Sequence, residues 1–339
     1  MGKQILLRKL KKAASGKHGK TLDFSKMDSD WQWRLCNARM MLGEFHDYAG
    51  WQYRSAWSTN AWINRPVPGA PMWDGRYTQR LHVLGEQGLG DEILFAQCIP
   101  EVMQAVGKVV FESDGRLASI FERSFGVECV ARQKLTDERP GMSAWVCIGD
   151  LLRLYRTGKV WNGKPYLKPD PKRLREFDWA RDHQCLSWKG HHGEYDAAEF
   201  ADVVGAGIDV QYDATHSTLI QPGIDKRADL EGLLALLSVA KGLVSVSTSV
   251  VHLAAALGRP VDLVLAPPYT GPNYDQLQWR WTLRGNKTPW YESVTIYRSL
   301  KEYAHLLLRN TRKARRLQGV ESRPGLAVER ERQSVLSAG

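Results

Sequence analysis

The chain has 339 residues, of which 43% are hydrophobic and 25% are charged, and its formal net charge is +10. This composition is typical of an ordinary globular protein with two domains or one large domain, and it excludes a disordered chain and a disulfide scaffold. The charge is concentrated at the ends, since residues 1–22 carry +7 and residues 309–339 carry +5, which leaves residues 23–308 at −2 within the total of +10. A basic chain usually suggests a nucleic-acid partner, and here that prediction applies only to the two ends.

The five cysteines are widely scattered and form no CxxC pair. This spacing indicates neither a disulfide framework nor a zinc site, and a reducing cytoplasm fits best. The longest apolar stretch, residues 243–257, is interrupted by polar residues and falls short of the roughly 20 residues that span a membrane. The apolar run at residues 5–7 is too short for a signal peptide. The sequence therefore predicts a cytoplasmic protein without a membrane span.

The chain begins with a basic arm, residues 1–22. Residues 23–65 follow as a short helical segment with apolar residues at roughly helical spacing. Residues 64–75 are rich in proline and glycine, which indicates a linker or an extended crossing segment.

Strand and helix patterns then alternate along the chain. The expected strands are residues 81–84, 109–111, 127–130, 144–148, 185–188, 208–212, 243–246, 261–266 and 294–297. The expected helices are residues 91–106, 116–123, 150–156, 196–204, 230–240 and 248–257, with a last helix from about Leu300. Alternation of this kind predicts an α/β fold with parallel sheets.

A proline-rich joint near residues 165–171 separates two such runs. We therefore expect two doubly wound domains, residues 66–170 and 171–300, closed by a helix and a basic tail over residues 301–339. Such domains bind ligands at the carboxyl ends of their strands, and two facing domains would place a cleft between them.

The first motif is GEQGLGDEILFAQCIPEV, residues 85–102. Gly88 and Gly90 would let the backbone approach a ligand closely, and a helix start favours anions. The spacing is not that of a dinucleotide fingerprint. Asp91, at the expected helix start, could take a proton from a nucleophile, or it could simply cap the helix.

The second motif is LVSVSTSVVHLAAALGRP, residues 243–260. A buried strand runs into Ser247, Thr248 and Ser249, and a helix carrying His252 follows. Backbone N–H groups and hydroxyls at that start can hold a phosphate or pyrophosphate, and ordinary hydroxyl capping is the alternative. His252 is more typical of a packed, hydrogen-bonded histidine than of a reactive one.

Two further motifs contain positively charged side chains. In CLSWKG, residues 185–190, Lys189 follows a strand and could neutralise a phosphate, or it could be solvated. Residues 277–298 combine arginines with large aromatic side chains, which suit a nucleotide base and phosphate or, alternatively, packing between domains. These side chains are Trp279, Arg280, Trp281, Arg284, Trp290 and Tyr291.

Taken in this order, the motifs resemble the heptosyltransferase-like domain of glycosyltransferase family 9 that follows tetratricopeptide repeats in many bacterial proteins. The resemblance covers roughly residues 38–300, and its most specific blocks read GLGDEILFAQCIP and STSVVHLAAALGRP. The segment LGEFHDYAGWQYRSAW resembles the one that closes the last repeat, and PMWDG, LSWKG and QWRWTLRGNKTPWYES also match.

The resemblance implies a GT-B architecture, in which two Rossmann-like domains enclose the active site. It implies transfer of a hexosyl or heptosyl group from a nucleotide-diphosphate sugar to a hydroxyl, with inversion and without a required metal or other cofactor. Asp91 matches the acid that acts as general base in the family. The positions that match its donor-diphosphate site are Thr248, Ser249, Val250, His252 and Lys189. Other candidates for the cleft are Gly88, Gly90, Ser247, Trp279 and Arg280.

The chain departs from the family at two places. Ser247 stands where relatives usually carry an acid, and the residues after Gly190 read HHGEYDAAEF in place of a polar pattern. The alternative function is therefore a degenerate glycosyltransferase domain that acts as a sugar-nucleotide-binding or structural module. For the enzyme, the expected acceptor is a lipopolysaccharide-like saccharide or a modified DNA base, since the basic ends would attract either polyanion.

Overall fold

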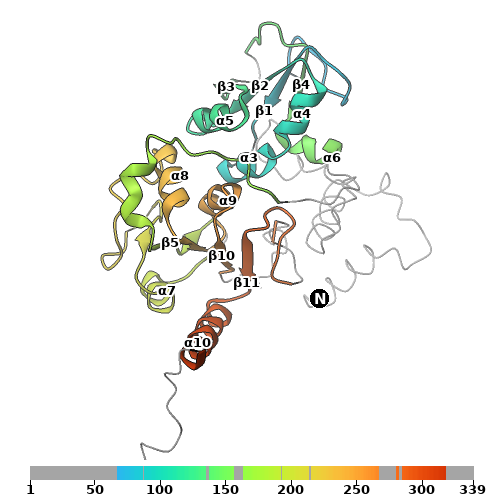
Figure 1. Ribbon diagram of the computed structural model, residues 1–339. Helices are drawn as coiled ribbons and strands as arrows, with labels where there is room; N and C mark the ends of the chain where they lie inside the picture. Colours follow the sequence, from blue (N-terminus) through green and yellow to red (C-terminus); the bar gives the residue numbers. More distant parts are fainter. Residues whose placement is uncertain are drawn as a thin grey trace, which may run out of the picture.

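The computed structural model shows an α/β fold built on two parallel sheets (Figure 1). It describes residues 67–86, 88–134, 137–155, 163–191, 193–213, 215–266, 280–281 and 285–317. The expected basic arm, the helical segment before residue 66 and the tail beyond residue 317 lie outside the described residues. No helix among the residues described is both long enough and apolar enough to cross a membrane.

The sheet of the first half, residues 67–155, has four parallel strands in the order β3-β2-β1-β4. These strands are β1 (Arg80–Leu84), β2 (Lys108–Ser113), β3 (Glu128–Ala131) and β4 (Ala144–Cys147). Its helices are α3 (Leu89–Ala96), α4 (Ile99–Ala105), α5 (Ala118–Phe125) and α6 (Leu151–Tyr155), with a 3-10 turn, η3 (Ile148–Asp150). Leu81, Val83 and Phe111 belong to the cluster of buried side chains that also contains the buried residues of α3, α4 and α5.

The single helix expected over residues 91–106 is wrong in two respects. The chain forms two helices, because Pro100 has no N–H with which to continue the hydrogen-bond ladder of α3 and instead occupies the first turn of α4. The first helix also begins earlier than expected, at Leu89, with Gly88 as its N-cap residue. Asp91 therefore lies in the first turn of α3 and does not open it.

The sheet of the second half, residues 163–317, has five parallel strands in the order β11-β10-β9-β5-β8. They are β5 (Gln184–Ser187), β8 (Ile208–Asp209), β9 (Gly242–Ser245), β10 (Val261–Val264) and β11 (Val294–Tyr297). Its helices are η4 (Leu174–Ala180), α7 (Ala197–Val204), α8 (Leu230–Val239), α9 (Ser249–Ala256) and α10 (Leu300–Leu317). A small antiparallel pair, β6 (Lys189–Gly190) and β7 (Gly193–Glu194), follows β5.

Helices cover both faces of this second sheet, because alternate strand residues point to opposite sides. Cys185 and Leu243 pack in the cluster with α8 and α9, whereas Leu186 and Val244 pack in the cluster with α7 and α10. Figure 1 shows the two pairs of helices on either side of the strands. This is the doubly wound layering that the alternating pattern predicts.

The strands that the sequence predicts are present, and most of their ends agree within two residues. The strand expected over residues 208–212 is shorter, because the carboxylate of Asp209 turns the chain. Asp209 accepts the N–H groups of Gln211 at 2.8 Å and His216 at 3.1 Å and pairs with Lys226 at 2.9 Å. These bonds form a compact turn in place of the three further strand residues that were expected.

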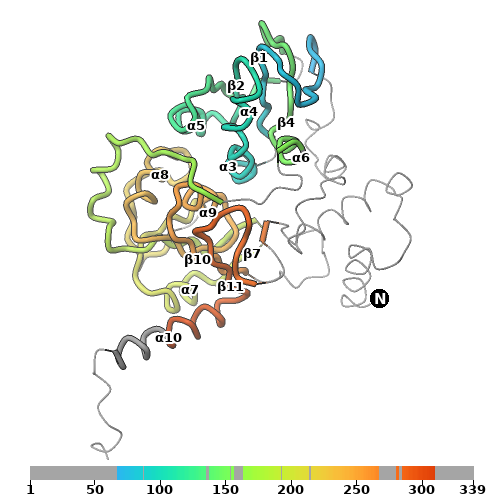
Figure 2. Tube along the Cα trace, turned by 45° about the vertical axis from the view of Figure 1, so that its right-hand side comes forward, coloured from blue at the N-terminus to red at the C-terminus, as the bar shows by residue number. Residues whose placement is uncertain are grey.

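The two halves share one continuous apolar core, in which α3 packs against α9. Both views show these helices side by side (Figures 1 and 2). The hydroxyl of Tyr166, in the segment that joins the halves, donates to the carbonyl of Ile93 at 2.5 Å.

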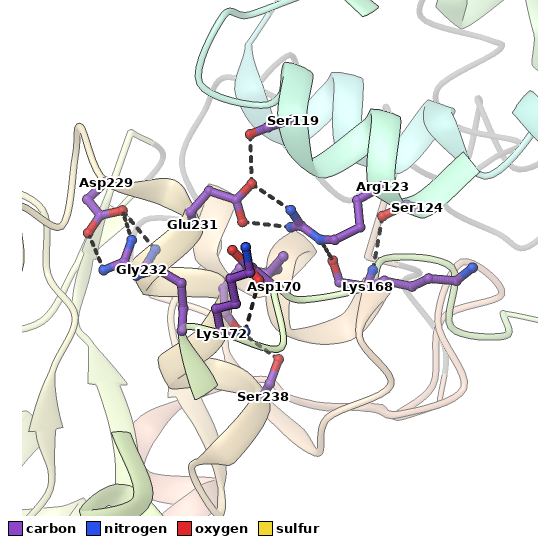
Figure 3. A network of polar contacts seen from close by, with 12 residues as sticks. Ser119, Arg123, Ser124, Lys168, Asp170, Lys172, Asp229, Glu231, Gly232 and Ser238 are labelled. Atoms are coloured by element: carbon purple, nitrogen blue, oxygen red, sulfur yellow. Dashed lines mark hydrogen bonds and ion pairs between the residues drawn. The ribbon is translucent and has the colours of Figure 1, made fainter. Parts of the chain in front are cut away.

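A polar contact also joins the halves beside this core (Figure 3). The guanidinium of Arg123 on α5 donates to both carboxylate oxygens of Glu231 on α8, at 2.9 and 2.6 Å. Ser119 donates to the same carboxylate at 2.7 Å, and Arg123 also donates to the carbonyl of Lys168. A bidentate arginine–carboxylate pair of this kind has a better defined geometry than a single exposed ion pair.

We expect Glu231→Gln to lower the free energy of unfolding by about 1 kcal/mol, because it removes the charge that faces Arg123. The matched control is Asp178→Asn, which breaks an exposed pair with Arg181 within one turn and should have no measurable effect. Urea denaturation of the three proteins measures both quantities. An equal loss of unfolding free energy in the two variants would contradict a stabilising role for the contact between the halves.

Candidate functional site

A pocket of about 390 Å³ lies at the carboxyl ends of strands from both sheets, where ligands bind in folds of this kind. Segments after β1, β5, β8 and β9 line it, together with two residues of α9 and one residue that precedes β11. The lining residues are Gly88, Leu89, Gly90, Asp91, Gly190, His191, Tyr212, Ser247, Thr248, Ser249, His252 and Arg280. The pocket thus brings together the glycine motif and the Ser-Thr-Ser motif, which lie about 160 residues apart in the sequence.

The side chain of Asp91 is both a cap and part of the pocket wall. Its Oδ2 accepts the N–H of Gly88 at 3.3 Å, which satisfies one of the open donors at the start of α3. Its Oδ1 pairs with the guanidinium of Arg280 from the other half of the chain. The capping alternative is therefore correct for Asp91, and its role as a base stays a prediction.

Two glycines allow the walls of the pocket to come together. A Cβ on Gly90 would lie 2.8 Å from Cδ2 of His252 and 3.6 Å from Cα of Ser249. A Cβ on Gly190 would overlap the carbonyl oxygen of Ser247. Any side chain at these two positions would push the start of α3, or the loop after β5, away from the start of α9.

The start of α9 faces the pocket without a side-chain cap. Thr248 occupies the N-cap position with extended backbone, yet it makes no capping bond, and its Oγ1 lies 3.2 Å from Oγ of Ser245 instead. The capping alternative is therefore wrong for Thr248. The first N–H groups of a helix carry its partial positive charge, so this end of the pocket favours an anion. Ser249 lines the pocket, whereas the side chain of Val250 is buried in the core.

His252 is a neutral, packed side chain that forms one wall of the pocket. It is 4% exposed, its Nδ1 lies 2.9 Å from the hydroxyl of Tyr291, and its ring stacks on Trp281 with centroids 5.5 Å apart. Burial lowers the pKa of His252 to about 3. It carries no positive charge at neutral pH, so it can offer a phosphate only a hydrogen bond.

Lys189 is not among the residues that line the pocket. Its Nζ lies 3.3 Å from Asp213 and 3.8 Å from Glu194, and the hydrogen bond with Asp213 raises the pKa of Lys189. Gln211, which the sequence analysis missed, fixes this loop by accepting the N–H groups of Trp188 at 3.2 Å and Lys189 at 3.0 Å. The loop presents Gly190 and His191 to the pocket, and the lysine points to the two carboxylates.

Arg280 supplies a cation inside the pocket, as the sequence predicts. Burial lowers the pKa of Arg280 to about 10, so the guanidinium keeps its charge at neutral pH. Its carbonyl accepts the hydroxyl of Thr288 at 3.0 Å, and the next residue, Trp281, donates to Oγ of Ser247 at 2.8 Å. These bonds hold the backbone of Arg280 beside the start of α9.

The other aromatic candidates have different positions. Trp281, Trp290 and Tyr291 are buried in the core, so the packing alternative is correct for them. Trp279 and Arg284 lie outside the described residues. Sequence reasoning missed Tyr212, which is 40% exposed at the pocket and follows β8 at the point where the chain turns.

Glu92, the neighbour of Asp91, is turned into the protein and holds the start of α3. Its Oε1 accepts Nε of Arg132 at 2.7 Å, and its Oε2 accepts the N–H of Asp114 at 2.9 Å. Burial raises the pKa of Glu92 to about 7, and Arg132 offsets this only in part. Of the two adjacent acids, only Asp91 lines the pocket.

Comparison with known proteins gives distant similarities. No family model matches the chain. The chain is 27% identical over 303 residues to the protein FlbA of Caulobacter vibrioides, an alignment that covers 73% of this chain and 48% of FlbA. The chain therefore spans about half the length of this curated relative.

Among solved structures, the chain is similar to E. coli ADP-heptose LPS heptosyltransferase II, with a TM-score of 0.43 and 12% identity over 69% of this chain and 100% of that one. It is similar to the dodecameric iron-containing glycosyltransferase TibC of enterotoxigenic E. coli, with a TM-score of 0.44 and 12% identity over 70% of this chain and 78% of that one. It is also similar to the glycosyl transferase family 9 protein of Veillonella parvula, with a TM-score of 0.40 and 13% identity over 59% of this chain and 84% of that one.

The raised pKa of Glu92 predicts a pH dependence of stability. Because its pKa rises from 4.5 in an exposed carboxyl to about 7 in the folded chain, the folded chain binds more protons than the unfolded chain between these values. Stability from this group is present below pH 4.5 and is lost as the pH rises through about 7, by up to about 3 kcal/mol. Glu92→Gln should flatten this part of the profile in denaturation measured from pH 4.5 to 7.5. Parallel profiles for the two proteins would contradict it.

Proposed function

We propose that the chain is an inverting, metal-independent glycosyltransferase that moves a hexosyl or heptosyl group from a nucleoside-diphosphate sugar to an acceptor hydroxyl. The observation that carries this proposal is one pocket with an acid on one wall and an uncapped helix start on the other. Asp91 supplies the acid and Thr248 begins the helix. Both lie in the two sequence blocks that most resemble glycosyltransferase family 9, and the proposed architecture is the GT-B one, with domains of residues 66–170 and 171–300.

The donor diphosphate would lie against the start of α9. The N–H groups of Ser249 and Val250 would donate to its oxygens, and the hydroxyls of Thr248 and Ser249 lie at the same end of the pocket. Arg280 would supply the compensating charge that the sequence analysis assigns to Lys189. In this proposal His252 contacts the donor as a neutral group.

The proposed chemistry follows from the acid on one wall of the pocket and the helix start on the other. The acceptor hydroxyl attacks C1 of the sugar on the face opposite the diphosphate, the bond from C1 to the phosphate oxygen breaks, and the anomeric centre inverts. Asp91 takes the proton of the hydroxyl as the new bond forms. The helix end and Arg280 stabilise the negative charge that the leaving diphosphate acquires, so the proposed step includes no metal ion.

A second candidate is a nucleotide-sugar-binding module without transferase activity. It is favoured by the engagement of both oxygens of Asp91 and by Ser247, whose hydroxyl accepts the indole N–H of Trp281.

For the enzyme, the proposed acceptor is a lipopolysaccharide-like saccharide or a hydroxylated DNA base. Either would bring the negative charge that the basic ends of the chain attract.

Asp91→Asn tests the function directly. Once thermal-shift screening has identified the stabilising nucleotide sugar, we expect this variant to lower the rate of sugar transfer or donor hydrolysis by about 100- to 10,000-fold, because the amide cannot accept the proton. Mass spectrometry of the products measures the rate. A wild-type rate in the variant would show that Asp91 is not the base. Stabilisation of the wild type without transfer or hydrolysis would favour the binding module.

Ser249→Pro tests the helix start. Proline is tolerated at the first position of a helix and suits the extended backbone of Thr248, but it removes one N–H from the pocket. We expect the dissociation constant of the nucleoside diphosphate to rise by at least about tenfold, since a hydrogen bond to a charged group is lost. Ser249→Ala, which keeps the N–H, should change it by less than about threefold. Calorimetric titration measures both, and equal constants for the two variants would contradict the assignment.

A further inference from the structure

The proposed reaction leaves the ion pair between Asp91 and Arg280 unexplained. The two side chains come from different halves of the chain and are 14% and 13% exposed, respectively. Arg280 pairs with Oδ1 of Asp91, while Oδ2 accepts the N–H of Gly88 at 3.3 Å. Both oxygens of the proposed base therefore have a partner, and the positive charge of Arg280 beside Oδ1 disfavours proton transfer to the carboxylate until the guanidinium moves away.

Arg280 is placed to leave this pair without leaving the pocket. Its backbone is fixed on both sides, by Thr288 at its carbonyl and by the bond from Trp281 to Ser247. Ser247 directly precedes Thr248, so the backbone of Arg280 is tied to the start of α9. Only its flexible side chain has to swing from Asp91 towards a ligand held at that helix start.

The charges favour such an exchange. A nucleoside diphosphate carries more negative charge than one carboxylate, and a guanidinium can bind two phosphate oxygens at once. The start of α9, where the proposed diphosphate would lie, lines the same pocket as Arg280. The bond from Gly88 to Asp91 does not depend on Arg280, so the carboxylate keeps its orientation when Arg280 departs.

We propose that Arg280 is a donor-sensing positioning residue, which pairs with Asp91 before the donor binds and moves to the diphosphate when it binds. This inference rests on the function proposed above. In this arrangement Asp91 becomes available as the base only when Arg280 has moved to the diphosphate leaving group and balances its charge. The donor therefore binds productively before the acceptor.

A double-mutant cycle on ligand binding tests the exchange without any measurement of transfer. ADP, UDP and GDP are each titrated calorimetrically into the full-length chain, and the tightest is used with the wild type, Asp91→Asn, Arg280→Ala and the double variant. We expect Asp91→Asn to tighten binding about tenfold, because Arg280 no longer has to leave the charged carboxylate of Asp91. In the Arg280→Ala background, the same change should tighten binding less than threefold, since only repulsion between Asp91 and the phosphates is removed.

Arg280→Lys provides the conservative control. It keeps the charge, so it should bind the diphosphate more tightly than Arg280→Ala and should again gain affinity when Asp91→Asn is added. Thermal unfolding of each variant checks that it is folded.

Two results would overturn the exchange while leaving the proposed function intact. One is an equal gain from Asp91→Asn in both backgrounds, which would show that the two side chains act independently. The other is unchanged or weaker binding by Asp91→Asn, which would show that the pair stays intact in the complex. Failure of all three diphosphates to bind any of the variants would overturn the proposed function and this inference together.

Discussion

The arrangement of the pocket depends on the contact between the start of α3 and the start of α9. Gly90 makes this contact possible, since a Cβ there would meet the ring of His252 at 2.8 Å. The contact continues as an apolar core through both halves and includes the bond from Tyr166 to Ile93. Because α3 and α9 begin close together, Asp91 and Ser249 line one pocket although their helices follow strands of different sheets.

The same contact explains the charge balance of the pocket. Two helix starts and the guanidinium of Arg280 contribute positive charge there, and Asp91 supplies the negative charge that faces them. His252 adds no charge, because its burial favours the neutral ring. Because Arg280 pairs with Asp91, an anionic ligand that binds Arg280 must compete with that carboxylate.

The acid that lines the pocket differs from the buried acids that stabilise the first half of the chain. Glu92 pairs with Arg132, and Glu112 pairs with His82 and Arg139, so these buried carboxyl groups hold strands and turns together. Desolvation raises the pKa of Glu92, whereas the hydrogen bonds from His82 and Arg139 outweigh burial and lower the pKa of Glu112. Asp91 differs from both in lining the pocket, and that position makes it the candidate base.

The sequence by itself determined the α/β alternation and the positions of most strands, because apolar periodicity and the glycine and proline residues act over a few neighbouring residues. It also pointed to Asp91, the Ser-Thr-Ser segment and Arg280, each of which lines the pocket. Only the tertiary structure decided that Thr248 leaves its helix uncapped, that Lys189 points to carboxylates and that Arg280 pairs with Asp91. These outcomes depend on contacts between side chains that lie far apart in the sequence, and local sequence patterns carry no information about such contacts.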